Sequence, residues 1–172
     1  MTRAPTLHTE RLTLRPYQNS DWDSYLAFWT SDRAQHMGGP VSAAEAWAWF
    51  TNDASTWALN DFGTLAIDVD GKQAGFVGLV QPPNFPEPEC GWTLFDGFQG
   101  NGYAAEAGAA ILAHTFATTE LETVVSYIAP ANKSSAKVAV KIGGVEDHDA
   151  TGPANQDNRV FRYMRPATGA IQ

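Results

Sequence analysis

Residues 91–107 read GWTLFDGFQGNGYAAEA, and this stretch predicts how the chain folds around its functional site. Residues 90–95 read as the end of a β-strand, whereas residues 104–118 are rich in Ala and carry apolar side chains at helical spacing. A turn must therefore join a strand to a helix here. Its glycines allow close approach of the backbone to a ligand, because no Cβ atoms stand in the way; they are Gly97, Gly100 and Gly102.

The turn comes directly before a helix N-terminus, which is a favourable place for an anion. The first N–H groups of a helix have no partner within it and carry the positive end of the helix dipole. Two familiar phosphate-binding patterns are excluded, because the chain has no G-x-x-x-x-G-K-[ST] and its glycines are not spaced as G-x-G-x-x-G. A glycine-rich turn that binds nothing is the alternative.

Three residues of the turn, Gln99, Gly102 and Ala104, match the Gln/Arg-x-x-Gly-x-Gly/Ala signature of the GNAT superfamily of N-acetyltransferases. The flanking GWTL and GYAAEA, the NKSS at residues 132–135 and the TERLTLRP at residues 9–16 resemble the RimJ/RimL-like branch, which acetylates the N-termini of ribosomal proteins. In that branch the loop cradles the pyrophosphate of acetyl-CoA. The resemblance implies cofactor contacts from Gln99, Gly100, Asn101, Gly102, Tyr103 and Ala104.

Length and composition indicate one globular domain. A chain of 172 residues is long enough to bury a core without a metal or a disulfide, and 44% of it is hydrophobic. We expect a single N-acetyltransferase domain over residues 1–172, with its core at about 7–166 and a loose tail at 167–172. The net charge of −8 argues against a nucleic-acid partner and would suit a cationic amine.

The compartment and the metal content are predicted from what the sequence lacks. One cysteine, Cys90, excludes an internal disulfide and a multi-cysteine zinc site. The first residues have no apolar signal region, and no apolar run approaches the roughly 18 residues of a membrane span, so we expect a cytoplasmic protein with no membrane partner. His8, His114 and His148 lack metal-ligand spacing, and we expect no metal.

The pattern of elements predicts an α/β fold, and the resemblance implies its arrangement. We expect a GNAT-like domain whose mixed, mostly antiparallel, twisted sheet of about seven strands has splayed central strands and about four flanking helices. A type I′ turn at Asp70-Gly71 should close a hairpin. Arg11 and Arg15 should lie on a solvated or salt-bridged face. The expected strands are residues 7–16, 64–68, 73–80, 89–95, 123–128, 145–150 and 159–164.

Two N-terminal helices carry most of the tryptophans. The second should begin at a capping box of Ser42 and Glu45 and run to about Leu59. One interpretation is that their aromatic side chains pack onto the sheet. The other follows from the resemblance, in which this region and the loop with His36 and Met37 line the acceptor pocket. The oligomeric state stays open, although exposed aromatic side chains would be compatible with a homodimer.

The resemblance also implies where the thioester of the cofactor lies. In that fold the strands that end near Leu94 and Ile128 splay apart, and pantetheine fills the gap like an extra strand. Unpaired N–H groups around Trp92, Thr93 and Leu94 could then bind the thioester carbonyl and stabilise the developing oxyanion.

The attacking amine must be neutral, so a base or a water relay is needed. Glu89 is the first candidate, because it begins the strand beside the expected thioester site. A carboxylate at the rim without a catalytic role is the alternative. Cys90 as a covalent nucleophile is disfavoured, since no His lies at a recognisable spacing and the resembled family transfers acetyl directly.

The helix after residue 131 carries the remaining candidates. By resemblance, Ser135 would bond the cofactor sulfur or acetyl region as a catalytic residue, and Asn132 would bond the pantetheine amides; plain helix capping is the alternative for both. Lysines at 133, 137 and 141 repeat every four residues, where like charges repel. We expect Lys137, with Lys133 as a second candidate, to meet the 3′-phosphate of CoA, with a solvated face as the alternative.

Taken together, these patterns favour an acetyl-CoA-dependent N-acetyltransferase acting on a primary amine, either a protein N-terminus or a small molecule, by direct attack on the thioester. Two other classes stay open. One is a non-catalytic domain that binds and senses acyl-CoA. The other is an interaction protein that uses its aromatic helices.

Overall fold

The computed structural model describes residues 4–153 and 156–167, and its described part is built on one eight-stranded sheet. The strand order is β1-β2-β3-β4-β5-β6-β8-β7, and every neighbouring pair is antiparallel except β5 and β6. The predicted mixed, mostly antiparallel sheet is therefore confirmed, with eight strands in place of about seven. The strands are β1 (Leu7–His8), β2 (Thr13–Arg15), β3 (Thr64–Val69), β4 (Lys72–Val80), β5 (Glu89–Leu94), β6 (Thr123–Ile128), β7 (Val145–Glu146) and β8 (Arg159–Met164).

The N-terminal stretch forms two strands where one was predicted over residues 7–16. The chain turns back at Thr9, whose N–H donates to the Leu12 carbonyl at 3.0 Å, and Leu7 then pairs with Leu14. Two short paired strands therefore replace one long strand. Most of the tail predicted at 167–172 lies outside the described residues.

The strand predicted over residues 145–150 is shorter than expected. Val145 and Glu146 are the register pairs with β8, the Asp147 N–H adds one bond to the Val160 carbonyl at 2.9 Å, and the Asp147 side chain then closes a turn. Asp147 Oδ1 accepts the N–H groups of Asp149 and Ala150 at 3.2 and 3.1 Å, and an Asp that bonds the backbone two residues on competes with a sheet ladder.

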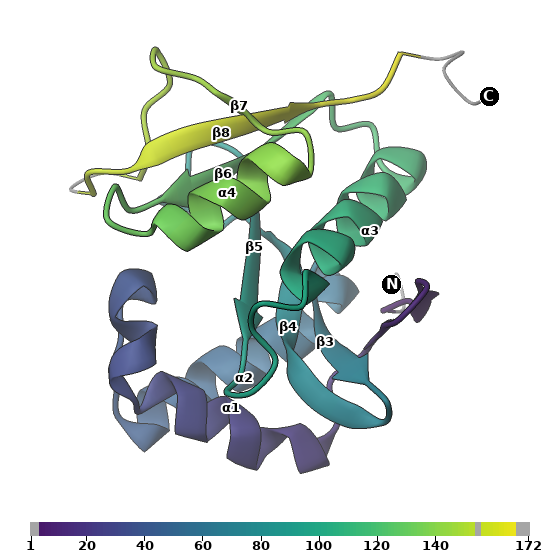
Figure 1. Ribbon diagram of the computed structural model, residues 1–172, viewed down its shortest axis with the longest axis vertical. Helices are drawn as coiled ribbons and strands as arrows, with labels where there is room; N and C mark the ends of the chain where they lie inside the picture. The colour runs from purple at the N-terminus through teal and green to yellow at the C-terminus, as the bar shows by residue number, and fades with distance from the viewer. Residues whose placement is uncertain (1–3, 154–155, 168–172) are drawn as a thin grey trace.

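Helices cover the sheet in two groups (Figure 1). Helices α3 and α4 pack in one hydrophobic cluster with inward side chains of β2 to β4, whereas a second cluster places aromatics of α1 and α2 against Phe76 and Phe95. The packing interpretation thus holds for the buried aromatics of α1 and α2. The helices are α1 (Trp22–Trp29), α2 (Ala43–Leu59), α3 (Tyr103–Thr118) and α4 (Lys133–Lys141), with 3-10 turns η1 (Asn19–Asp21) and η2 (Asp32–Met37).

Two features that short sequence patterns predicted are present in the structure, namely the capping box of α2 and the turn between β3 and β4. Ser42 caps α2, with reciprocal hydrogen bonds to Glu45, and the helix ends at Leu59. Asp70 and Gly71 have φ values of 49° and 74°, so both central residues of the β3–β4 turn adopt the positive φ that a type I′ hairpin needs.

A tight backbone contact between β3 and β4 provides a test of this architecture. A Cβ added at Gly78 would lie 2.3 Å from Thr64 Cα and 2.5 Å from Gly63 O, so the strands would have to move apart. We expect Gly78→Ala to lower the free energy of unfolding by about 1–3 kcal/mol, measured by urea denaturation.

Gly91 is the matched control, because it pairs with Gly78 across β4 and β5 but faces open space. Gly91→Ala should change the free energy of unfolding by no more than about 0.5 kcal/mol. An equal loss in both variants would contradict the described packing of these strands.

Candidate active site

The central feature of the site is the separation of β5 from β6. These parallel strands share one register pair, Glu89 with Val125. The Val125 N–H donates to the Pro88 carbonyl at 3.0 Å, and the Ser126 hydroxyl donates to the Cys90 carbonyl at 2.6 Å. Beyond that point β5 continues to Leu94 without a further register pair to β6, and the two strands run in clearly different directions (Figure 1). The predicted splaying is therefore present.

The separation directs main-chain groups of β5 into the gap. The Phe95 N–H donates to the Ala74 carbonyl of β4 at 2.8 Å, and in an antiparallel ladder successive residues face alternate sides. The main-chain N–H and C=O groups of Thr93 therefore point to β4, whereas those of Trp92 and Leu94 point away from it. The Leu94 carbonyl already accepts bonds from Arg33 Nη2 at 2.9 Å and Gln99 Nε2 at 3.0 Å. The N–H groups of Trp92 and Leu94 are thus directed towards the gap.

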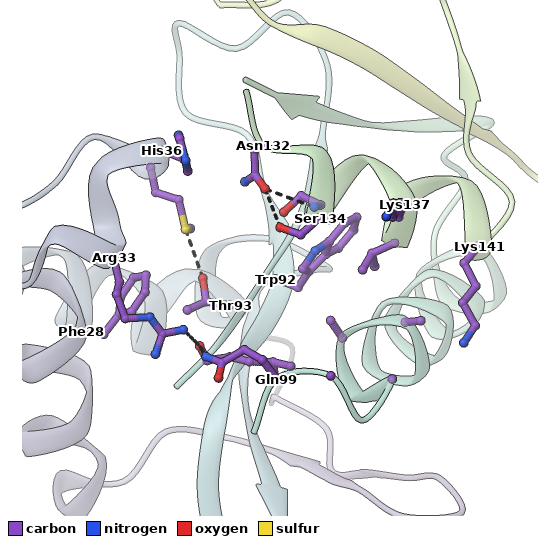
Figure 2. A pocket seen from close by; sticks show the side chains of 18 residues that line it. Phe28, Arg33, His36, Trp92, Thr93, Gln99, Asn132, Ser134, Lys137 and Lys141 are labelled. Atoms are coloured by element: carbon purple, nitrogen blue, oxygen red, sulfur yellow. Dashed lines mark hydrogen bonds between the residues drawn. The ribbon is translucent and has the colours of Figure 1, made fainter. Parts of the chain in front are cut away.

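A cavity of about 400 Å³ lies along this edge of β5 (Figure 2). It runs from η2, past the end of β5, to the glycine loop, the first turn of α3 and one side of α4. Its lining residues are Phe28, Arg33, His36, Met37, Trp92, Thr93, Leu94, Gln99, Gly100, Gly102, Ala104, Ala105, Asn132, Ser134, Ser135, Lys137, Val138 and Lys141. Most of the predicted cofactor residues are brought together here.

The glycine loop has a backbone conformation with positive φ, which is energetically unfavourable for residues other than glycine. Gly97, Gly100 and Gly102 have φ values of 85°, 81° and 82°. Gly102 is the N-cap of α3, so the unpaired N–H groups of that helix begin at the cavity wall. A Cβ at Gly102 would lie 3.5 Å from Arg11 Nη2 and 3.9 Å from Lys141 Nζ. Two cations therefore flank the helix N-terminus.

Arg11 holds the loop from outside the cavity. Its Nη1 donates to the Asn101 carbonyl at 2.9 Å, its Nε donates to Glu106 Oε2 at 2.8 Å, and its guanidinium lies 4.8 Å from the centre of the Tyr103 ring. Asn101 and Tyr103 are therefore adjacent to the cavity but are not among its lining residues. They shape the loop that surrounds the site.

Gln99 braces the turn with its side chain. Its Nε2 donates to the carbonyls of Leu94 and Phe95 at 3.0 and 2.8 Å, which fixes the path from β5 into the loop. The residue also lines the cavity.

The start of α4 combines helix capping with a place in the cavity. Asn132 Oδ1 accepts the Ser135 N–H at 3.1 Å and the Ser134 hydroxyl at 2.9 Å, so the capping interpretation of Asn132 is seen directly. Its amide nitrogen takes no part in these two bonds. Of the three lysines, Lys137 and Lys141 line the cavity, whereas Lys133 is not among the lining residues.

A smaller cavity of about 70 Å³ adjoins the first on the side of β6. It is lined by Glu89 and Tyr127, and it shares His36, Trp92 and Ser135 with the larger cavity. Glu89 and Ser135 therefore face the same opening between the strands. Burial raises the pKa of Glu89 to about 7, although its Oε1 accepts the Tyr127 N–H at 3.3 Å, which acts in the opposite direction.

Cys90 is poorly suited to react as a thiolate. Its side chain is buried, and burial raises the pKa of the thiol far above its ordinary range. Its carbonyl instead anchors a buried network, in which the Ser126 hydroxyl also lies 3.0 Å from that of Tyr163. The network holds β5, β6 and β8 together at the point where the gap begins.

Residues that the sequence analysis did not assign to the site come from distant parts of the chain. Phe28 of α1 and Arg33 of η2 form one wall, where Arg33 pairs with Asp96 and bonds the Leu94 carbonyl. Lys141 could have been found, because it continues the four-residue spacing that marks Lys137. His36 and Met37, which the resemblance implied for the acceptor pocket, line both cavities, and Met37 Sδ accepts the Thr93 hydroxyl at 3.1 Å.

Comparisons with known proteins agree with this geometry. The family model of the acetyltransferase (GNAT) domain matches residues 11–145. YnaD, an uncharacterised N-acetyltransferase of Bacillus subtilis (strain 168), is 28% identical over 137 residues, which are 78% of this chain and 79% of the relative.

Solved structures share the fold over nearly the whole chain. An acetyltransferase from Agrobacterium tumefaciens is 41% identical with a TM-score of 0.89, over 95% of this chain and 96% of that chain. RimL, a ribosomal α-N-protein acetyltransferase in complex with coenzyme A, is 16% identical with a TM-score of 0.74, over 93% and 98% of the two chains. At that identity the likeness to RimL concerns the fold alone.

The chain belongs to the GNAT family of acetyltransferases, because the family model spans most of its length. The predicted family and the predicted enzyme class are confirmed. Acetyl-CoA is the acetyl donor of this family. Within residues 4–153 and 156–167, no helix is long and apolar enough to cross a membrane, and no group of three or more His, Cys, Asp or Glu side chains could hold a metal ion.

Proposed function

We propose that this protein is an acetyl-CoA-dependent N-acetyltransferase that moves the acetyl group to a primary amine by direct attack on the thioester. The acceptor is a protein N-terminus or a small-molecule amine. The observation that carries the proposal is the open edge of β5, which leads from the glycine loop to Glu89 along one cavity system. We also propose that the chain forms one domain and acts in the cytoplasm. A homodimer would be compatible with this function.

The residues around the cavity fit the anionic end of acetyl-CoA. The chain carries a net charge of −8, yet Lys137 and Lys141 line this cavity and Arg11 lies behind its loop. Backbone N–H groups at the start of α3 suit the pyrophosphate, and we assign Lys137 to the 3′-phosphate. Lys141 Nζ would lie 3.9 Å from a Cβ at Gly102 in the loop, which suits Lys141 to the pyrophosphate.

The open edge of β5 fits the other end of the cofactor. Pantetheine amides can bond main-chain groups directed into the gap, as a neighbouring strand would, and the amide nitrogen of Asn132 can add a donor. Acetyl-CoA supplies an activated thioester carbonyl. The N–H groups of Trp92 and Leu94 can stabilise negative charge on its oxygen, each by about 3 kcal/mol if well aligned.

Glu89 has the properties of a general base for this reaction. With its pKa raised to about 7, the carboxylate is a stronger base than an ordinary Glu and is still substantially ionised at neutral pH. It faces the opening through which an amine can approach beside His36 and Met37. Ser135 lines both cavities and would donate a hydrogen bond to the sulfur as the thiolate leaves.

The cofactor part of the proposal is tested by two glycine variants of one loop. Gly102 and Gly97 have nearly equal positive φ values, so Val at either position meets the same backbone strain, but only Gly102 lines the cavity. Calorimetric titration with acetyl-CoA should show an affinity at least about tenfold lower for Gly102→Val and within about twofold of the unmutated protein for Gly97→Val.

Three outcomes would count against the proposal. Equal affinity losses in the two variants would reject the assigned position of the cofactor. No binding by the unmutated protein would favour an interaction protein. Tight binding without thiol release in the presence of any amine would favour an acyl-CoA-sensing domain.

The role of Glu89 is tested by the pH dependence of kcat/KM. A raised pKa means that the basic form is lost as the pH falls through about 7, so the rate should fall there. Glu89→Gln should remove this inflection and lower the rate by roughly 10²–10⁴-fold.

Glu87 provides the control for this experiment. Arg162 bonds Glu87 and holds the pKa of its carboxyl below the ordinary range, so Glu87 stays ionised over the tested pH range. Glu87→Gln should keep the inflection near pH 7. An unchanged profile in Glu89→Gln would exclude Glu89 as the base.

A further inference from the structure

The turn between β1 and β2 reaches the glycine loop through one arginine. Arg11 Nη1 donates to the Asn101 carbonyl at 2.9 Å. Glu106 of α3 holds the arginine in place, because Arg11 Nε donates to Glu106 Oε2 at 2.8 Å and the Arg11 N–H donates to Oε1 at 2.9 Å. The Thr9 hydroxyl donates to the same Oε1 at 2.6 Å. Both carboxylate oxygens thus fix Arg11, and its Nη1 is directed to the loop.

The geometry of this contact matters more than its strength. Arg11 is exposed, and an exposed ion pair adds little to stability. A guanidinium is planar, however, so the bonds to Glu106 fix the direction in which its remaining donors point. The pair is therefore suited to setting the orientation of one main-chain carbonyl.

That carbonyl belongs to the same peptide group as the Gly102 N–H. In a planar trans peptide the C=O and N–H bonds point in opposite directions, so the bond from Arg11 turns the Gly102 N–H away from the arginine. Arg11 is not among the residues that line the larger cavity, whereas Gly102 is. No main-chain hydrogen bond in the described part of the chain uses the Gly102 N–H, and Gly102 is only partly buried, so a ligand can reach it.

Without the bond to Arg11 this peptide group could turn over. Such a turn changes φ of Gly102, and glycine accepts a wide range of φ at little cost. The reversed peptide would present a carbonyl oxygen where the N–H had been. An oxygen there would repel a phosphate group, whereas an N–H at the start of a helix binds one. The glycine leaves the orientation of the peptide open, and a contact from outside the loop is needed to fix it.

We propose that Arg11 is a positioning residue for the cofactor. Through the Asn101 carbonyl it holds the Gly102 N–H towards the cavity, where this donor binds the pyrophosphate of acetyl-CoA. Glu106 takes part because it fixes the guanidinium. The inference rests on the proposed function and adds to it two side chains outside the cavity that determine the affinity for the cofactor.

The amide resonance of Gly102 in ¹⁵N NMR spectra of the full-length protein provides the test. Saturating acetyl-CoA should move the Gly102 amide proton downfield, because the N–H gains a phosphate acceptor. Arg11→Met removes the donors but keeps a long unbranched side chain, and it should bind acetyl-CoA at least about tenfold more weakly. At saturation the Leu94 amide should still shift in this variant, whereas the downfield shift of Gly102 should be lost.

Arg159 of β8 provides a matched control. Its Nε and Nη2 bond Glu146 at 2.6 and 2.7 Å. Its guanidinium lies 4.9 Å from the centre of the Phe161 ring, close to the 4.8 Å between Arg11 and the Tyr103 ring. Arg159 lines neither cavity of the proposed site. Arg159→Met should therefore keep the acetyl-CoA affinity within about twofold and leave the amide shift of the loop unchanged.

Arg11→Lys separates the position of the donors from the positive charge. Lysine keeps a cation behind the loop, but its single nitrogen cannot reproduce the planar fork that joins Glu106 to the Asn101 carbonyl. We expect this variant to fold and to bind acetyl-CoA at least about threefold more weakly than the unmutated protein.

The possible results distinguish this inference from the proposed function. No binding of acetyl-CoA by the unmutated protein would refute both. Binding without a downfield shift of the Gly102 amide would refute the inference alone, and this measurement does not depend on the folding of any variant. Full affinity in Arg11→Lys would also overturn it, because charge alone would then suffice. Loss of the Leu94 shift in Arg11→Met, or equal affinity losses in Arg11→Met and Arg159→Met, would indicate a general structural effect and overturn it too.

Discussion

The functional part of this structure depends on the point where β5 and β6 stop pairing. Up to the Glu89–Val125 pair they are neighbours in one sheet, and beyond it β5 presents a main-chain edge to a cavity. Buried polar groups of a backbone need partners, so such an edge suits a ligand that can hydrogen-bond like a strand. The buried bonds of Ser126 fix where the separation begins, because they join the Cys90 carbonyl of β5 to Tyr163 of β8.

Hydrogen bonds from side chains on both sides fix the position of this open edge of β5. Arg33 and Gln99 both bond the Leu94 carbonyl, which fixes the end of β5 between η2 and the glycine loop. Arg11 fixes the far side of the loop through the Asn101 carbonyl. The acidic protein thus places Arg33, Lys137 and Lys141 along one cavity, whereas Glu89, whose pKa is raised, lines the smaller adjoining cavity.

Features that depend on local chemistry were predictable from the sequence. The positive φ of Gly102, the capping box of α2 and the Asp70-Gly71 hairpin each follow from residues within a few positions of one another. Family resemblance added the splayed strands, which no local pattern indicates. Together they place the predicted cofactor residues in or beside one cavity, and their roles in binding and catalysis stay predictions.

Features that depend on distant contacts were not predictable. The turn at Thr9 that divides the first strand is held from far along the chain, because the Thr9 hydroxyl and the Arg11 N–H both donate to Glu106 Oε1 of α3, at 2.6 and 2.9 Å. No sequence pattern marked Arg33 as a site residue, because Arg33 reaches the site through a hydrogen bond to the Leu94 carbonyl, far along the chain. The raised pKa of Glu89 arises from burial beside β6, a strand that lies more than thirty residues further along the chain.

The most direct test of this account is the behaviour of individual β5 amides when acetyl-CoA is added to ¹⁵N-labelled protein. We predict that the N–H resonances of Trp92 and Leu94 shift strongly and that these groups become protected from hydrogen exchange, while the Thr93 N–H, which faces β4, changes little in exchange. Saturating acetyl-CoA that leaves the exchange of Trp92 and Leu94 unaltered would contradict the claim that the open edge of β5 receives the cofactor.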